Sequence, residues 1–235
     1  MLCKIADLIV EVPEAGGMAS RLKEYLYDGP EMAQIIIDAE QYNPNRWPGA
    51  SYEALCYMDS GTHFYGNLLQ HYGLMLHASA VALDGKAYLF SAPSGTGKST
   101  HTRLWQAAFE DAAQVFNDDK PALRRVNDVW YAYGTPWCGK DGINQNKKVP
   151  LGGICYLNRG MENKIRRLTS QEAMKRIVSQ TMRRFALVEN LDLMLSHVDE
   201  LVRTIPVYEL ECLPNEDAAR LSCETMRSGA EEMGL

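Results

Sequence analysis

The sequence predicts an α/β fold built around a mixed sheet, and three observations support this prediction. A glycine-rich loop, residues 92–99, follows the apolar run 87–91 and precedes a segment of helical composition. The pair Asp84-Gly85 separates that run from another apolar run, 74–83, and such a pair is favoured in the type I′ turn of an antiparallel hairpin. Downstream, short strand-like runs are interspersed with longer helical segments. We therefore expect an antiparallel hairpin joined to a strand–loop–helix unit, with helices on the faces of the sheet.

The remaining elements follow from hydrophobic periodicity and from the positions of Gly, Pro and Asn. Strands are expected at residues 5–12, 32–37, 74–83, 87–91, 113–117, 122–126, 129–133, 153–157, 165–168 and 207–211. Helices are expected at residues 18–27, 52–72, 99–110, 170–180, 189–205 and 215–227. The second of these helices contains Ser60 and Gly61, where we expect an interruption. The chain divides into an α+β lead-in, residues 1–73, and a core that carries the glycine-rich loop, residues 74–235.

Composition and charge exclude several classes of protein. The chain has 235 residues, a net charge of −6 and an isoelectric point near 5.4, which argues against nucleic-acid binding. No apolar run approaches the roughly 18 residues that a membrane span needs, and the N-terminus does not resemble a secretion signal. The six cysteines are scattered without metal-ligand spacing. We therefore expect a cytoplasmic protein with reduced thiols and no membrane contact.

The loop at residues 92–99 carries most of the functional information. It reads Ala-Pro-Ser-Gly-Thr-Gly-Lys-Ser, which fits the Walker A pattern except that Ala92 replaces the first glycine. Glycines let the backbone turn its N–H groups inward, and the helix that follows adds its positive end. Lys98 would contact the β- and γ-phosphates, and Ser99 would bind magnesium. We expect ATP with Mg²⁺ here, contacted by residues Pro93, Ser94, Gly95, Thr96, Gly97, Lys98, Ser99 and Thr100.

Two acidic residues follow the next expected strand, about twenty residues beyond the loop. Asp118 and Asp119 come directly after Asn117, and one crossover helix plus one strand would return the chain to the phosphate site. We predict that Asp118 is the metal-side carboxylate, directly or through water. We predict that Asp119 is the base that takes the proton of an attacking hydroxyl.

Hairpin register places a histidine at the same site. A two-residue turn at Asp84-Gly85 pairs Leu83 with Lys86, so the numbers of paired residues sum to 169 along the ladder. His77 then falls opposite Ala92, the first residue of the loop. We expect its imidazole to contact a phosphate oxygen or to orient Asp119.

These motifs together resemble the HPr kinase/phosphorylase family, which shares a phosphate-loop fold with the phosphoenolpyruvate carboxykinases. The resemblance is carried by Leu76-His77-Ala78, the hairpin turn at Asp84-Gly85, the Ser94-Gly95-Thr96-Gly97-Lys98-Ser99 segment and Asn117-Asp118-Asp119. It implies a kinase core of that type, with Lys98 and Ser99 at phosphate and magnesium, Asp118 at the metal, Asp119 as the catalytic acid and His77 beside it. It also implies a homo-oligomer.

Two departures from that family concern the acceptor. The loop begins with Ala92-Pro93 where the family commonly has Gly-Asp, and the family's Arg-Gly-rich signature segment is missing after the Asp pair. Residues 134–140 stand roughly in its place. We therefore expect an acceptor other than HPr, namely a serine of a peptide or protein, or a small-molecule alcohol such as free serine.

The segment 134–148 is rich in Gly, Lys and Asn, and it is long enough to form a lid or acceptor loop. We expect Trp137 to be exposed there, and Lys140 is a candidate for balancing transition-state charge. The pairs Arg166-Arg167 and Arg183-Arg184 would reach a phosphate or lie in solvent, and the sequence does not choose between these alternatives.

The sequence favours an ATP-dependent phosphotransferase acting on a hydroxyl, because a hydroxyl acceptor needs a base such as Asp119. One alternative is a nucleotide-gated ATPase or switch that acts through a protein partner, with residues 134–148 as the responsive segment. A third hypothesis is carboxykinase-like or phosphorylase chemistry on a small acid.

Overall fold

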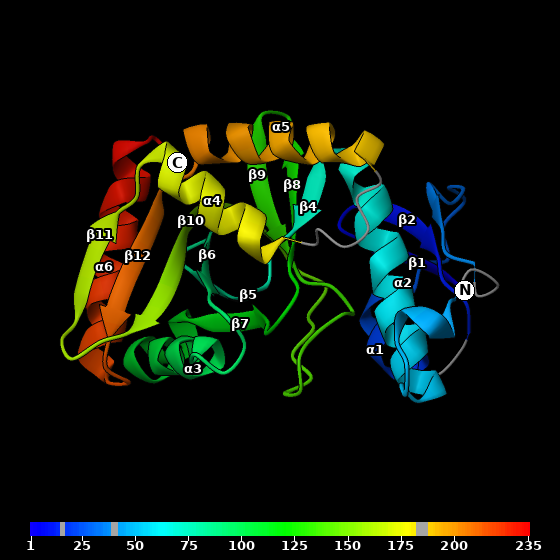
Figure 1. The fold of residues 1–235 in the computed structure, drawn as a ribbon, viewed down its shortest axis with the longest axis horizontal. Coiled ribbons are helices and arrows are strands. Elements are labelled where there is room, and N and C mark those ends of the chain that lie inside the picture. Colours follow the sequence, from blue (N-terminus) through cyan, green and yellow to red (C-terminus); the bar gives the residue numbers. More distant parts are fainter. Residues whose placement is uncertain (15–16, 39–41, 182–187) are drawn as a thin grey trace.

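The computed structural model describes residues 1–14, 17–38, 42–181 and 188–235. Within these ranges the strands form two sheets, one of three strands near the N-terminus and one of nine strands. Figure 1 shows the small sheet and helix α2 at one end of an elongated molecule and the larger sheet spanning the rest. The described helices are all too short or too polar to cross a membrane.

The N-terminal sheet consists of β1 (Leu2–Ile5), β2 (Leu8–Glu11) and β3 (Ile35–Ile36). The prediction of one continuous strand over residues 5–12 was wrong. The chain turns back at Ala6 and Asp7, which have φ of 52° and 60°, so β1 and β2 form a tight hairpin. Ala-Asp is a weak sequence signal for such a turn, because neither residue is a glycine or asparagine.

Helices α1 (Met18–Leu22) and α2 (Tyr52–Leu68) pack with this sheet around a shared apolar cluster. The two are followed by the short 3₁₀ turns Lys23–Tyr25 and Leu69–His71. Another 3₁₀ turn, Pro44–Arg46, lies in the expected loop before α2. Ser51 begins α2 by accepting the N–H of Ala54, as an N-cap residue does.

The large sheet is mixed. Its main path runs β4, β8, β9, β10, β6, β5, β7, and β12 and β11 continue from β10. The strands are β4 (Gly73–Met75), β5 (Ala78–Leu83), β6 (Lys86–Ser91), β7 (Gln114–Asn117), β8 (Ala122–Val126), β9 (Val129–Tyr133), β10 (Lys148–Arg159), β11 (Lys164–Arg167) and β12 (Val207–Cys212). Strands β6, β10 and β12 are parallel neighbours, so their carboxyl ends share one edge. Ligands commonly bind at such an edge in α/β proteins.

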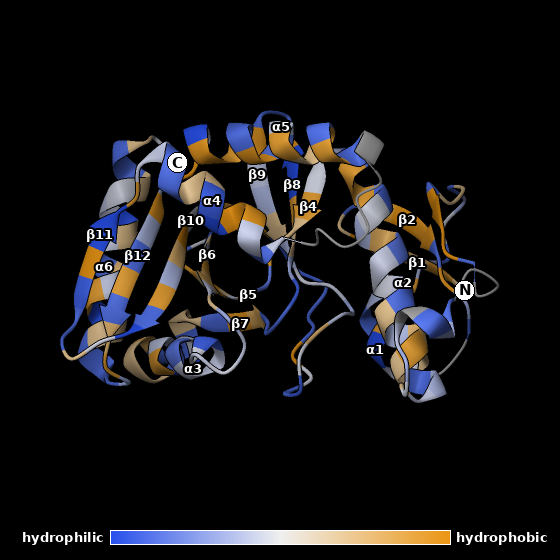
Figure 2. Cartoon of the chain, in the orientation of Figure 1, coloured by the Kyte–Doolittle hydropathy of each residue, from blue (hydrophilic) through white to orange (hydrophobic). Residues whose placement is uncertain are grey.

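Helices cover both faces of this sheet, as predicted. They are α3 (Lys98–Phe109), α4 (Ser170–Gln180), α5 (Val188–Thr204) and α6 (Glu216–Glu232), with a 3₁₀ turn Glu110–Ala112 after α3. Along β5, alternate side chains serve different faces: Ala78 and Ala80 join the core under α4 and α5, whereas Val81 joins the core under α3 and α6. This period of two follows from strand geometry. Figure 2 shows hydrophobic and hydrophilic bands along α5, as expected for a helix with one face on the core.

The predicted hairpin register is confirmed. Ala78 pairs with Ser91 and Leu83 with Lys86, and Asp84 and Gly85 have φ of 50° and 75°. The predicted strand 74–83, in contrast, is broken at Leu76 and His77, because β4 pairs with β8 whereas β5 pairs with β6 and β7. His77 therefore lies just before β5, at the point where the chain changes partners.

The helix 52–72 has no interruption at Ser60 and Gly61. Both residues lie inside α2 and are buried, and a Cβ on Gly61 would come within 2.9 Å of the Trp137 ring. The small side chains at this point admit the indole of Trp137 rather than breaking the helix. The pair Ser60-Gly61, which is typical of a helix break, here allows close packing instead.

Candidate functional site

The glycine-rich loop joins the carboxyl end of β6 to the start of α3, in the strand–loop–helix context that the sequence predicted. Gly95 and Gly97 have φ of 77° and 125°, which L side chains rarely adopt. A Cβ built on either glycine would meet no atom within 4 Å, so the loop faces open space at both positions. Helix geometry leaves the first N–H groups of α3 without intrahelical acceptors. The backbone N–H groups of the loop and the positive N-terminal end of α3 therefore face the same open region.

Lys98 is buried at the first position of α3, with 8% of its surface exposed. Its Nζ donates a hydrogen bond of 3.0 Å to the carbonyl oxygen of Ala92, which bends the side chain back over the loop. Burial lowers the pKa of Lys98, and the negative charge of Asp119 opposes that shift. The ammonium group thus lies within electrostatic range of Asp119.

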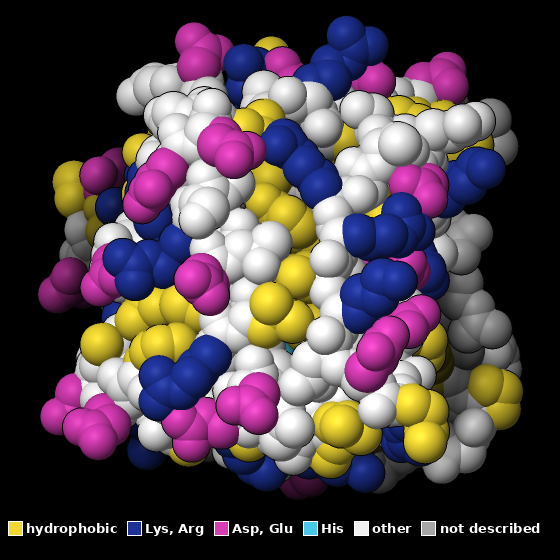
Figure 3. All heavy atoms as spheres, turned by 90° about the vertical axis from the view of Figure 1, so that its left-hand side faces the viewer, with side chains coloured by type: hydrophobic (Ala, Val, Ile, Leu, Met, Phe, Trp, Pro, Cys, Tyr) yellow, Lys and Arg dark blue, Asp and Glu magenta, His cyan; other side chains and the backbone are white. Residues whose placement is uncertain are grey.

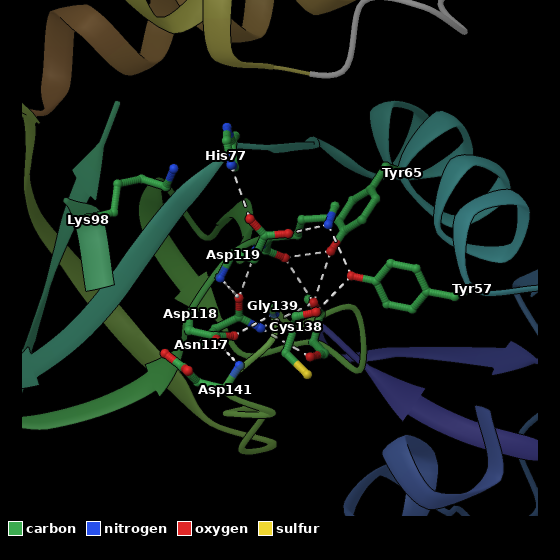
Figure 4. A network of polar contacts seen from close by, with 12 residues as sticks. Tyr57, Tyr65, His77, Lys98, Asn117, Asp118, Asp119, Cys138, Gly139 and Asp141 are labelled. Atoms are coloured by element: carbon green, nitrogen blue, oxygen red, sulfur yellow. Dashed lines mark hydrogen bonds and ion pairs between the residues drawn. The ribbon is translucent and has the colours of Figure 1, made fainter. Parts of the chain in front are cut away.

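Asp119 is held by two basic side chains. Its Oδ1 lies 3.1 Å from Nε2 of His77, and its Oδ2 forms an ion pair with Nζ of Lys120. Burial on its own would raise the pKa of Asp119, but the hydrogen bond from His77 and the charge of Lys120 hold it well below the ordinary range. Asp119 is therefore a carboxylate at neutral pH. Figure 4 shows His77 and Asp119 pointing toward each other.

His77 is fixed from both sides of its ring. Nδ1 lies 3.1 Å from Oε1 of Gln180 at the end of α4, and the His77 backbone N–H donates to the carbonyl of Gln180. Its own carbonyl accepts a hydrogen bond of 2.8 Å from the Ser91 hydroxyl, one residue before the loop. The predicted contact between His77 and Asp119 is thus present in the structure.

Asp118 faces the opposite direction from Asp119, toward the segment after β9. Its Oδ1 accepts the N–H of Gly139 at 2.6 Å, and its Oδ2 accepts the N–H of Asp141 at 3.2 Å. The carboxylate is buried, and burial raises its pKa despite these hydrogen bonds. A carboxylate has about four acceptor positions, so two remain for a metal or its water.

Asn117 fixes the turn that separates the two carboxylates. Its Oδ1 accepts the backbone N–H of Asp119 at 3.2 Å and that of Lys120 at 2.8 Å, and its Nδ2 donates to the carbonyl of Thr135. Such side-chain-to-backbone bonds are typical of asparagine in turns. Asn117 is a positioning residue that sequence reasoning noted only as part of a motif.

Lys120 is a site residue that sequence reasoning missed. Besides Asp119, its Nζ contacts the Tyr57 hydroxyl at 3.0 Å, and Tyr57 in turn donates to the carbonyl of Cys138 at 2.8 Å. This network connects α2, the acidic turn and the segment after β9 (Figure 4). The sequence feature that could have identified Lys120 is its position directly after Asp118 and Asp119.

The segment 134–147 is anchored to the protein along its length. Trp137 is fully buried, which corrects the expectation that it is exposed. Its ring stacks on Phe64 at 4.7 Å between centroids, and its Nε1 donates to the Ser60 hydroxyl at 3.0 Å. Further along, the N–H of Gln145 donates to the carbonyl of Phe116. Lys140 is exposed at the tip of this segment.

Among the arginines, Arg159 contacts the loop, and the sequence did not single it out. It lies at the end of β10, and its Nη2 donates to the carbonyl of Gly95 at 2.8 Å. Arg166 and Arg167 are exposed on β11 and pair with acidic residues. Arg183 and Arg184 lie outside the described residues.

The groups that would hold a magnesium nucleotide are the loop N–H groups, the buried Lys98 ammonium and the remaining acceptor positions of Asp118. The described residues contain no group of three or more His, Cys, Asp or Glu side chains arranged to hold a metal ion. Magnesium in nucleotide sites needs no such cage, because phosphate oxygens and water supply most of its ligands. Ser99 and Asp118 would supply the protein ligands, and the metal would neutralise charge on the phosphates.

Comparison with known proteins identifies a family. Residues 50–214, well over half of the chain, match the family described as SynChlorMet cassette protein ScmC. The chain belongs to the ScmC family. That match covers α2, the hairpin, the glycine-rich loop and the acidic turn, so every predicted site residue lies within it.

Two further comparisons are less informative. No curated protein matches this ScmC-family chain. A solved structure described as the Hpr(Ser) kinase/phosphatase from Coxiella burnetii aligns with 67% of this chain and 95% of its own, at 12% identity and a TM-score of 0.36. Similarity of this extent does not establish a common activity, so the resemblance to HPr kinases stays a resemblance of motifs.

Proposed function

We propose that this ScmC-family chain is a magnesium- and ATP-dependent phosphotransferase that moves the γ-phosphoryl group to a hydroxyl. The observation that carries the proposal is the Asp119 carboxylate, which is held ionised between His77 and Lys120 within electrostatic range of Lys98. A carboxylate beside a phosphate loop is suited to receive the proton of an attacking hydroxyl.

Each group has a defined part in this proposal. The loop N–H groups and Lys98 bind the phosphates, and magnesium supplies charge neutralisation when it is bound. Asp119 orients the acceptor hydroxyl and accepts its proton as the new O–P bond forms. The bond between the γ-phosphorus and the β–γ bridging oxygen breaks in the same step, and ADP leaves with that oxygen. His77 and Lys120 position Asp119. Because the pKa of Asp119 lies well below its ordinary range, it is a weak base, and orientation is its larger contribution.

The acceptor is proposed to be a serine of a peptide or protein, or a small-molecule alcohol. The negative net charge argues against nucleic acid. On the face drawn in Figure 3, Lys and Arg side chains are interspersed with Asp and Glu, and no broad area of one sign covers it.

The test is incubation of the protein with γ-labelled ATP, magnesium and a panel of acceptors containing free serine and threonine, polyols and serine-containing peptides. We expect label on one acceptor and none with Asp119→Asn. Label that appears only as inorganic phosphate, equally with and without every acceptor, would contradict the proposal.

One observation favours the alternative of a nucleotide-gated switch. The Asp118 carboxylate accepts N–H groups of Gly139 and Asp141, so a metal that used its remaining acceptor positions would be linked through Asp118 to that segment. A switch would hydrolyse ATP without an acceptor and would change the protease sensitivity of residues 134–147 on nucleotide binding. The acceptor panel separates these two functions.

A further inference from the structure

A pocket of about 400 Å³ adjoins the glycine-rich loop on the side away from Asp119. It lies where β10 and β12 end, beside the first two turns of α3. The residues that line it are Gly95, Thr96, Gly97, Thr100, His101, Leu104, Leu157, Asn158, Arg159, Gly160, Cys212, Leu213 and Pro214. Apart from Gly95, Thr96, Gly97 and Thr100, the sequence motifs had assigned no role to these residues.

Part of the lining is apolar and buried. Leu157 is 3% exposed, and Leu104 packs against the core under α3 and α6. Leu213 presents a hydrophobic side chain that is 38% exposed, and the lining also includes the polar side chains of Thr100 and Asn158. An exposed leucine in the lining of a pocket offers a contact surface to a flat apolar group of a ligand.

The pocket is continuous with the loop. Gly95, Thr96 and Gly97 belong to both, and Arg159 spans the boundary, since its guanidinium contacts the carbonyl of Gly95 at 2.8 Å. A ligand whose phosphates lie on the loop would therefore extend any attached organic group either into this pocket or toward Asp119. The second direction is needed for the acceptor.

We propose that this pocket holds the nucleoside part of the nucleotide, with Leu157 and Leu213 against the base and Arg159 at the boundary with the phosphates. This inference rests on the proposed function. A volume of about 400 Å³ falls in the range of small-ligand sites, about 300–1,000 Å³. The arrangement orders the site as nucleoside, phosphates, acceptor, from the β12 side to the β7 side.

The test compares two ligands that share phosphates but differ in the nucleoside. A non-hydrolysable ATP analogue and tripolyphosphate, each with magnesium, are titrated by calorimetry into the wild type, Leu213→Gln and Lys98→Ala. Glutamine matches leucine roughly in size and adds no charge. We expect Leu213→Gln to weaken the analogue about three- to tenfold and to change tripolyphosphate less than twofold, because only the analogue loses apolar contact.

The matched control is Leu191→Gln on α5, a leucine that is 42% exposed and is not part of the pocket lining. It is expected to bind both ligands as the wild type does. An unchanged affinity of Leu213→Gln for the analogue would overturn the pocket assignment, as would an equal loss for both ligands. If neither ligand bound to the wild type, the assignment of the glycine-rich loop as a phosphate site would be wrong. The pocket assignment would then be wrong as well.

Discussion

The two sides of the glycine-rich loop differ in how they are built. On the β7 side, charged groups crowd together: Asp119 contacts His77 and Lys120 at hydrogen-bond distance, and hydrogen bonds extend to α2. On the β12 side, the lining of an open pocket includes three leucines beside polar side chains, and Arg159 donates a hydrogen bond to the loop. The side chains on the β7 side, where charge would move during the reaction, are thus held in place by their neighbours. The β12 side instead leaves room for a ligand.

Lys98→Ala tests the feature that both sides share. We expect turnover of ATP to fall by more than about 10³-fold, because the ammonium group that would contact the β- and γ-phosphates is lost. Steady-state phosphate release and transfer to the acceptor measure the effect. Lys175→Ala, an exposed lysine on α4, is the control and should match the wild type. Normal turnover in Lys98→Ala would show that the glycine-rich loop is not the phosphate site.

Asp119→Asn changes only the β7 side of the loop, where the charged groups lie. We expect kcat to fall about 10²- to 10⁴-fold, because the amide cannot accept the hydroxyl proton, while binding of the ATP analogue changes little. Rapid-quench kinetics and calorimetry give the two quantities. If the affinity for the analogue fell as steeply as kcat, Asp119 would contribute to nucleotide binding as well. The two sides of the loop would then not have separate roles.

The same variant reports a pH dependence of stability. The folded-state pKa of Asp119 lies below its ordinary value of 3.8, so its ionised form contributes stability at higher pH that is lost as pH falls below that value. The free energy of unfolding of the wild type should therefore decrease more than that of Asp119→Asn when pH is lowered from 5 toward 3. Urea unfolding at a series of pH values measures this difference, and parallel curves would contradict it.

His101 gives the corresponding measurement on the pocket side. It is buried on α3, its Nε2 lies 3.0 Å from the Ser222 hydroxyl, and burial lowers its pKa from 6.5 to about 4. The neutral form is favoured on folding, so stability is present above pH 6.5 and is lost as pH falls toward 4. We expect a loss of at most about 3 kcal/mol over that interval. His101→Gln should remove this dependence in urea unfolding, and an unchanged slope would show that the side chain becomes protonated without cost.

The smallest effect is expected for Arg159→Gln. Loss of the hydrogen bond to the Gly95 carbonyl should weaken the ATP analogue and tripolyphosphate alike by about three- to tenfold, because the loop itself becomes less ordered. Leu213→Gln, in contrast, discriminates between the two ligands. If Arg159→Gln affected neither ligand, the contact with Gly95 would be unimportant for binding.

Local chemistry was predictable from the sequence, whereas long-range packing was not. The turn residues Asp84 and Gly85 fixed the hairpin register to the residue, and this register placed His77 beside the loop. The break at Leu76 and His77 depends on β4 pairing with β8, which no local pattern encodes. The burial of Trp137 likewise depends on α2, more than 60 residues earlier. Arg159 was missed because the neighbouring positions of β6 and β10 in the sheet come from topology alone.

The division into residues 1–73 and 74–235 remains a prediction. The N-terminal strands form their own sheet, yet Tyr57 and Tyr65 of α2 reach the acidic turn through Lys120 and its carbonyl. The lead-in thus contributes side chains beside the candidate site, a connection that the sequence did not suggest.

The β5–β6 hairpin has a consequence for how the protein tolerates change in length. His77 precedes one strand and Ala92 follows the other, and the turn that joins the strands lies at the opposite end. Residues inserted between Asp84 and Gly85 would lengthen the far tip and leave the spacing between imidazole and loop intact. One residue removed from within either strand would shift that spacing and reverse the facing of every side chain beyond it. Insertions during evolution are therefore expected to accumulate at the turn, and the six-residue arms are expected to keep their length.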